Sequence, residues 1–133
     1  MDSSWLTILK LSFYIGIGGA LGANARYWIG GWLTGRLEGV FPYATFFVNV
    51  TGSFILGLFI TLIAERYIVI PPHLRPLIAI GFLGSYTTFS TFEYETFALA
   101  NSGNYLQAIL NAGLSLSAGF VAVWLGIRLA RFL

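Results

Sequence analysis

The 133-residue sequence contains no cysteine, a single histidine and few charged side chains. Without cysteine the chain can form neither a disulfide framework nor a thiolate metal site, and one histidine makes no metal-binding cluster. Charged residues make up 9% of the chain, against roughly 25% in an ordinary soluble domain. The seven basic residues are spread singly, which argues against a nucleic-acid-binding surface. No nucleophile and base stand out as a pair, so the sequence does not predict an enzyme.

The sequence is instead rich in long apolar segments. Hydrophobic residues make up 57% of it and are concentrated in four runs, at residues 6–33, 42–64, 73–100 and 105–132. Each run has the ~20 residues that a helix needs to cross a bilayer. The short connections between them are rich in glycine, proline and polar residues and leave no room for a soluble domain. We therefore expect an all-α membrane protein in which residues 1–133 form a single transmembrane domain of four helices.

The third run differs from the others because hydroxyl side chains and two glycines interrupt it. Residues 81–92 read Gly-Phe-Leu-Gly-Ser-Tyr-Thr-Thr-Phe-Ser-Thr-Phe. We expect this helix to break between Gly84 and Thr88, which would free backbone polar groups at membrane depth. Irregular backbone persists there only where protein covers it or where it lines a polar cavity. Broken helices are where transporters bind ions, so the break is the first candidate functional site.

Two polar residues in the first and second runs are further candidates. Arg26 lies one to two turns before the end of the first run, where its side chain either extends to the lipid headgroups or attracts anions at a water-filled mouth. Asn49 is the strongly polar side chain of the second run. Its amide either hydrogen-bonds a neighbouring helix or donates to an anion in a pore. The residues alone leave both choices open.

Phe89 and Phe92 follow the expected break and lie three residues apart, so a helix places them on one face. The pair is either ordinary core or part of an anion path, since the edge of a phenyl ring carries the positive part of its quadrupole. Polar residues on the third and fourth runs are candidates beside it, and an ionisable group inside a membrane is a functional candidate in its own right. They are Ser90, Thr91, Glu95 and Asn111.

Two further patterns concern packing and orientation. Gly18 and Gly22 form a Gly-x-x-x-Gly pattern that predicts a close packing face, either within the chain or between subunits. Five of the seven basic residues fall on the side that holds the termini and the second loop, which favours both ends in the cytoplasm. These five are Lys10, Arg66, Arg75, Arg128 and Arg131, and the other two are Arg26 and Arg36.

Together these features resemble the CrcB/Fluc family of fluoride channels over essentially the whole chain. The resemblance implies a fluoride-selective channel of the bacterial inner membrane that exports fluoride passively and so reduces its toxicity. It also implies an antiparallel, dual-topology homodimer with two narrow pores and a structural sodium ion at its centre. The motifs that carry it are residues 81–92, Gly18-Gly19-x-x-Gly22-x-x-x-Arg26, and Val48-Asn49 with Gly52.

The resemblance also implies a role for each candidate residue. Main-chain carbonyls of Gly84 and Thr87 would bind the sodium ion. Phe89 and Phe92 would form an aromatic box in the fluoride path, and Asn49 would be the amide of the pore. The remaining roles would be the mouth of the pore for Arg26, and the rest of the fluoride path for Ser90, Thr91, Glu95 and Asn111.

The main alternative is a small proton-coupled exporter of the multidrug-resistance type, which also has four spans. That class needs a membrane-embedded carboxylate in its first span, whereas residues 6–33 contain no aspartate or glutamate. A membrane scaffold subunit is a further alternative, but it would leave the hydroxyl-rich break unexplained. The sequence therefore favours a fluoride channel whose partners are fluoride, the bilayer and a second copy of itself.

Overall fold

The computed structural model describes residues 3–65 and 67–133, and within these ranges it consists of helices and the loops between them. Met1, Asp2 and Arg66 lie outside the described residues, and so does the part of the predicted charge bias that rests on Arg66. In chain order the elements are α1 (Ser3–Thr34), α2 (Tyr43–Ala64), α3 (Leu74–Pro76), η1 (Leu77–Leu83), α4 (Gly84–Tyr86), α5 (Phe89–Asn101) and α6 (Tyr105–Phe132).

These bounds agree closely with the four predicted spans. Within the described residues, α1, α2 and α6 are the helices that are long and apolar enough to cross a membrane. The third predicted span corresponds to α3, η1, α4 and α5 together, which run from Leu74 to Asn101 and are interrupted between α4 and α5. The all-α class is confirmed, and the third span is a broken helix.

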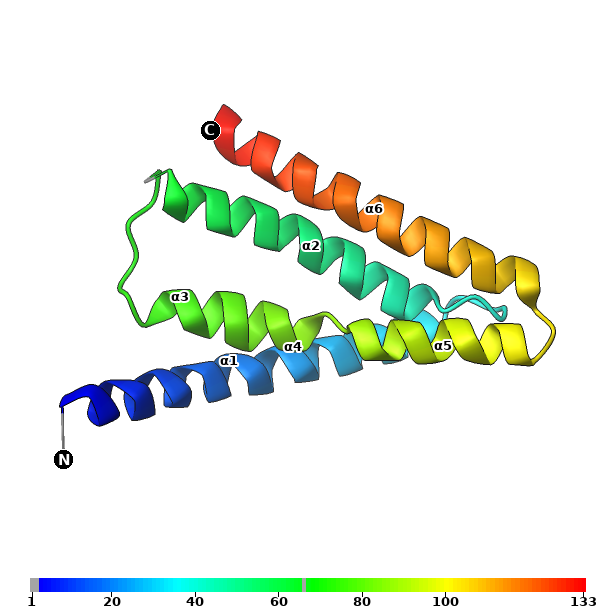
Figure 1. Ribbon diagram of the computed structural model, residues 1–133, viewed down its shortest axis with the longest axis horizontal. Coiled ribbons are helices and arrows are strands. Elements are labelled where there is room, and N and C mark those ends of the chain that lie inside the picture. The colour runs from blue at the N-terminus through cyan, green and yellow to red at the C-terminus, as the bar shows by residue number, and fades with distance from the viewer. Residues whose placement is uncertain (1–2, 66) are drawn as a thin grey trace.

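The helices form two groups that α5 joins (Figure 1). α2 runs alongside α6, while α1 runs alongside η1 and α4. α5 continues the broken span and packs against α6. The start of α1, the end of α6 and the loop between α2 and α3 all lie at one end of the molecule. This is the arrangement that four successive spans require.

Glycine allows α1 to pack directly on the backbone of η1. A side chain at Gly18 would collide with the backbone of Leu77, and one at Gly22 with the backbone of Phe82. From the other side, Gly81 lies against the backbone of α1. The Gly-x-x-x-Gly pattern therefore serves packing within the chain, the first of its two interpretations. The π-helical turns of η1 had no counterpart in the sequence prediction.

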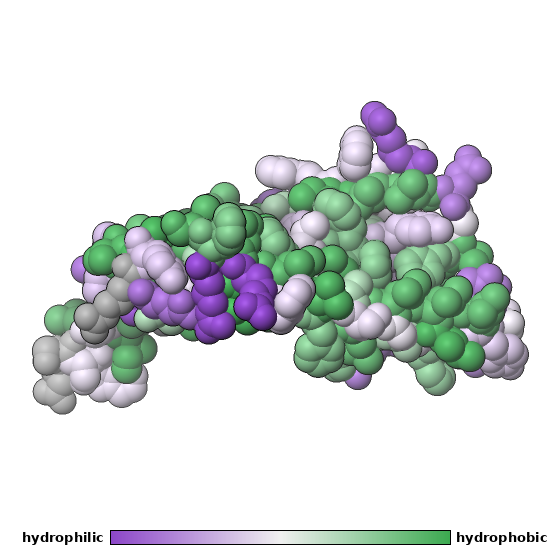
Figure 2. Space-filling model, turned by 90° about the horizontal axis from the view of Figure 1, so that it is seen from above, coloured by the Kyte–Doolittle hydropathy of each residue, from purple (hydrophilic) through white to green (hydrophobic). Residues whose placement is uncertain are grey.

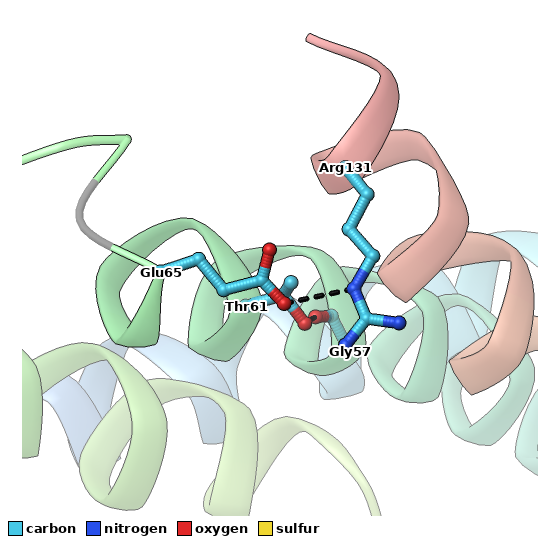
Figure 3. Close-up of polar contacts among 4 residues, drawn as sticks. All are labelled: Gly57, Thr61, Glu65 and Arg131. Carbon is cyan, nitrogen blue, oxygen red and sulfur yellow. Dashed lines mark hydrogen bonds and ion pairs between the residues drawn. The ribbon is translucent and has the colours of Figure 1, made fainter.

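α2 packs on α6 at Gly57, where a side chain would meet the backbone of Val123. One turn further on, Thr61 donates its hydroxyl hydrogen to the Gly57 carbonyl at 2.8 Å, so this polar atom is satisfied within α2. Where the helix ends, Arg131 Nε donates to Glu65 Oε1 at 2.8 Å (Figure 3). This ion pair joins the C-terminal ends of α2 and α6, and because it is partly exposed it contributes about 1 kcal/mol or less.

Many large apolar side chains remain exposed in the single chain, and Figure 2 shows how much of one face is hydrophobic. Phe13, Trp28 and Phe120 are examples, and Phe120 is 77% exposed. Soluble monomers rarely expose apolar patches larger than roughly a few hundred Å². The exterior is therefore suited to lipid and to contact with other membrane-embedded protein, as expected of a multi-pass membrane protein.

Candidate functional site

The third span breaks at Thr87 and Thr88. Gly84 keeps helical dihedral angles, whereas Thr87 (φ −84°, ψ 160°) and Thr88 (φ −153°, ψ 115°) are extended. α5 begins at the next residue, and Thr88 caps it because the Thr88 Oγ1 accepts the N–H of Thr91 at 3.3 Å. The predicted break is confirmed, and it falls on the threonines rather than on the glycine.

Asn49 on α2 holds the break from the side. Its Oδ1 accepts the Thr88 N–H at 2.8 Å, and its Nδ2 donates to the Thr88 carbonyl at 3.0 Å. These bonds fix the orientation of the amide, since a backbone N–H only donates and a carbonyl only accepts. An amide nitrogen carries two hydrogens, so Nδ2 keeps one for a further acceptor. One side chain can thus brace a helix and donate in a polar path.

The same bonds change the hydrogen bonding of the preceding turn. In an unbroken helix the Gly84 carbonyl would accept the N–H of Thr88, and the Thr87 carbonyl that of Thr91. Here the Thr88 N–H is bonded to Asn49 and the Thr91 N–H to the Thr88 hydroxyl oxygen. The carbonyls of Gly84 and Thr87 therefore lose their helical donors. These are the two positions that the sequence resemblance assigned to sodium.

The break borders a groove of about 360 Å³, called here the break groove. Residues of α2, the broken span and α6 line it, including serine hydroxyls from α2 and α6 at Ser53 and Ser115. The structure brings together five of the predicted site residues here, which are Asn49, Gly84, Thr87, Phe89 and Phe92.

The two phenylalanines differ in environment although both line the break groove. Their ring centroids are 5.7 Å apart and the ring planes are inclined by 41°. Phe92 is buried, with 8% of its surface exposed, whereas Phe89 is 64% exposed. Phe92 is therefore part of the core of a single chain, while Phe89 presents its ring to whatever covers the groove.

A second groove, of about 420 Å³, contains Arg26 and is called here the arginine groove. α1 and α2 contribute to it, and from the broken span it receives Thr88 and Thr91. Thr88 lines both grooves, so the break lies between them. The arginine is half-buried in this groove, which both threonines also line, and its role at the mouth of a pore stays a prediction.

Glu95 is hydrogen-bonded to Thr45, a residue of the arginine groove that was not among the predicted site residues. Thr45, which lines this groove, donates to Glu95 Oε1 at 2.9 Å. Glu95 Oε2 is buried and has no hydrogen-bond partner among the described residues. The signal for Thr45 was its position four residues before Asn49, which places both on one face of α2.

Besides Glu95, which contacts the arginine groove only through Thr45, two predicted residues line neither groove. Asn111 is fully buried between α5 and α6, where its Nδ2 donates to Thr96 Oγ1 at 2.8 Å and its Oδ1 accepts from Ser115 at 3.2 Å. Ser90 is exposed on α5. Asn111 is thus linked to the break groove through Ser115, which lines it.

Side-chain metal ligands do not gather at this site. Among the described residues, no group of three or more histidine, cysteine, aspartate or glutamate side chains is placed to bind a metal ion. A cation at the break would depend on main-chain oxygens, the kind of ligand that unwound helices offer to sodium. Gly84 and Thr87 fit this chemistry because their carbonyls have lost their helical donors.

The fold and the site together define a small multi-pass membrane protein whose third span is broken and held open by an asparagine on the second. A family model described as CrcB-like protein, Camphor Resistance (CrcB), matches residues 13–127. The chain belongs to this family.

Curated relatives agree with this assignment. The chain is 49% identical over 114 residues to the fluoride-specific ion channel FluC of Acidobacterium capsulatum, covering 86% of this chain and 90% of that one. It is 45% identical over 125 residues to the protein of the same name from Geotalea daltonii, covering 94% of this chain and 100% of that one. For the Methylococcus capsulatus protein of that name the identity is 46% over 119 residues, covering 90% of this chain and 52% of the longer relative.

Proposed function

We propose that this chain forms a fluoride-selective ion channel that exports fluoride passively across the bacterial inner membrane and so reduces its toxicity. The observation that carries the proposal is the break in the third span. There Asn49 and Phe89 line one groove together with Gly84 and Thr87, whose carbonyls have lost their helical donors. Relatives named as fluoride-specific channels, at 45–49% identity over most of the chain, support fluoride as the ion. Fluoride and chloride efflux from liposomes that contain the purified protein tests the proposal.

Fluoride is small and strongly hydrated, so its path has to replace lost water with hydrogen-bond donors and still release the ion. The break groove offers the second Nδ2 hydrogen of Asn49 and the ring edges of Phe89 and Phe92. On α5, the Thr91 hydroxyl, which lines the arginine groove, continues the path, and the exposed Ser90 hydroxyl would join it only where a partner covers that face. Several weak contacts in series suit conduction better than one strong binding site does.

The arginine groove supplies the positive charge of the proposed path. Arg26 is half-buried there, so it attracts an anion without enclosing it. Glu95, held by Thr45, lies beside this groove on α5. Asn111 joins the path on the α6 side, where it orients the Ser115 hydroxyl that lines the break groove.

The second element of the proposal is an antiparallel homodimer. The break groove lies on the surface of the single chain, and the Phe89 ring is 64% exposed within it. One chain therefore leaves the path open along its side. A second copy would cover it, and pairs of identical chains are most often related by a two-fold axis. The antiparallel orientation rests on the family resemblance alone. The predicted bias of basic residues toward one side of the membrane favours a single orientation instead.

The third element is a structural sodium ion, which Gly84 and Thr87 would hold through their carbonyl oxygens. Both residues line the groove that a partner would cover, and both carbonyls have lost their helical donors. One chain offers two such oxygens, so a symmetric pair of chains would offer four. When bound, the cation would offset the converging carbonyl dipoles of the two breaks.

A further inference from the structure

Tyr86 immediately precedes the break and has no part in the proposed fluoride path. It ends α4, it is 5% exposed, and its ring stacks on Phe82 with centroids 6.0 Å apart and planes within 8°. A buried tyrosine usually has a hydrogen-bond partner for its hydroxyl. That partner is Thr51 on α2, whose Oγ1 lies 2.9 Å from the Tyr86 hydroxyl oxygen.

The direction of this bond follows from the other contact of Thr51. The Thr51 hydroxyl donates to the Phe47 carbonyl at 2.7 Å, and a carbonyl only accepts. A hydroxyl has one hydrogen, so Thr51 has none left to donate to Tyr86. Tyr86 is therefore the donor and Thr51 the acceptor. Removing the tyrosine hydroxyl would keep the ring in place but delete this bond between α4 and α2.

The break rests directly on the same turn of α2. A side chain at Gly52 would collide with the Thr87 methyl group and come within 3.1 Å of the Tyr86 ring. Thr51 and Gly52 lie within one turn of Asn49, which bonds the residue after Thr87. One turn of α2 thus contacts the chain before, at and after the break.

We propose that Tyr86 is a positioning residue of the ion path. Its hydroxyl anchors the upstream side of the break to Thr51, as Asn49 anchors the downstream side, and the two anchors together fix the orientation of the Thr87 peptide between them. This inference rests on the proposed function, because the orientation matters for transport only if the break serves an ion path.

The test compares Tyr86→Phe with Tyr105→Phe, which removes the same hydroxyl from an exposed residue at the start of α6. Each variant is purified by gel filtration, reconstituted at matched density and assayed for fluoride efflux. We expect Tyr86→Phe to lower the efflux rate roughly fivefold, the scale of one lost hydrogen bond, and Tyr105→Phe to leave it unchanged. Hydrogen–deuterium exchange should rise in the segment 84–91 of Tyr86→Phe and stay unchanged in α6.

Variants of the acceptor separate positioning from general destabilisation. Thr51→Ser keeps the acceptor oxygen and should retain most of the flux, whereas Thr51→Val should reproduce the Tyr86→Phe loss. The double variant Tyr86→Phe with Thr51→Val should be no worse than either single variant, because both remove one bond. Wild-type flux in Tyr86→Phe, additive losses in the double variant, or exchange that rises equally in every helix would each overturn the inference. If the wild type itself shows no fluoride efflux, it is the proposed function that fails.

Discussion

The side-chain amide of Asn49 forms hydrogen bonds with both the N–H and the carbonyl of Thr88, at 2.8 Å and 3.0 Å. A single residue of α2 thereby replaces the helical partners of an extended residue in the middle of the third span. Backbone groups at membrane depth need such partners, since an unsatisfied one costs several kcal/mol there. Asn49 therefore makes the break possible and also places a donor in the groove beside it.

Replacing Asn49 by aspartate should suppress fluoride flux strongly, by tenfold or more on the scale of ~1.4 kcal/mol per factor of ten. A carboxylate can still accept the Thr88 N–H, but it cannot donate to the Thr88 carbonyl, and it sets a negative charge against an anion. Flux is measured by a fluoride electrode on variant protein that elutes like the wild type on gel filtration.

The matched control for this change is Asn24→Asp. Asn24 also donates from its side chain to a backbone carbonyl, that of Ala20 at 2.8 Å, but it is exposed on α1. The Asn24→Asp variant should therefore show the fluoride flux of the wild type. Equal fluoride flux in Asn49→Asp and wild type would show that Asn49 is not part of the ion path. If the variant instead fails to assemble on gel filtration, Asn49 only holds the two helices together.

Substitutions of the two phenylalanines should differ in their effect on stability, although both should lower fluoride flux. Phe89→Ile should lower fluoride flux with little change in thermal stability, because the ring is largely exposed and its positive edge is what the change removes. Phe92→Ile should lower both, since reshaping a buried side chain typically costs about 1–3 kcal/mol. Melting temperature and efflux are measured on the same preparations.

Phe13→Ile is the control for an exposed ring, since Phe13 lies on α1 at 68% exposure. It should match the wild type in both measurements. Undiminished flux in Phe89→Ile and Phe92→Ile would return the pair to ordinary packing and would remove the aromatic part of the proposed path.

Gly52→Ala should push the break away from α2. The added methyl group would collide with the Thr87 methyl group, so the Asn49 bonds and the groove would both be disturbed. We expect lower flux together with a lower melting temperature. Gly113→Ala serves as the control, because a side chain there meets nothing within 4 Å, and alanine in a helix is favoured over glycine by up to about 1 kcal/mol. Equal behaviour of the two variants would show that the close contact at Gly52 is unimportant.

Removing sodium should destabilise the assembled protein. If carbonyls of Gly84 and Thr87 converge on a cation, its loss leaves their dipoles in mutual repulsion. Purified protein exchanged into a buffer whose cation is N-methylglucamine should therefore melt at a lower temperature than in sodium. A dimer that melts at the same temperature in both buffers would argue against a structural sodium ion.

The sequence predicted the features that depend on local residue patterns. Apolar run length gave the four spans, and the hydroxyls and glycines at 81–92 marked the break in the third. The break was expected between Gly84 and Thr88, and within that range Gly84 stays helical while Thr87 and Thr88 are extended. The helix breaks at the threonines because the Thr88 side chain caps α5 and the Thr88 backbone bonds to Asn49. Asn49 lies on another helix, so the residues of the third span do not reveal this contact.

Features that depend on contacts between distant helices were not predictable in this way. Thr45 and Glu95 are 50 residues apart in sequence and meet only after α2 and α5 are placed. The burial of Asn111 between α5 and α6, and its separation from the break groove, likewise depend on helix packing. The π-helical turns of η1 lie against α1, and residue patterns within the third span do not predict them.

The most direct measurement is passive ion efflux from liposomes that contain the purified protein, loaded with either fluoride or chloride at the same pH inside and outside. Valinomycin and a potassium gradient balance the charge, and ion-selective electrodes record each anion. We expect rapid fluoride efflux without a proton gradient, and chloride efflux no faster than from protein-free liposomes. Equal efflux of the two anions, or fluoride efflux that requires an imposed proton gradient, would contradict a fluoride-selective channel.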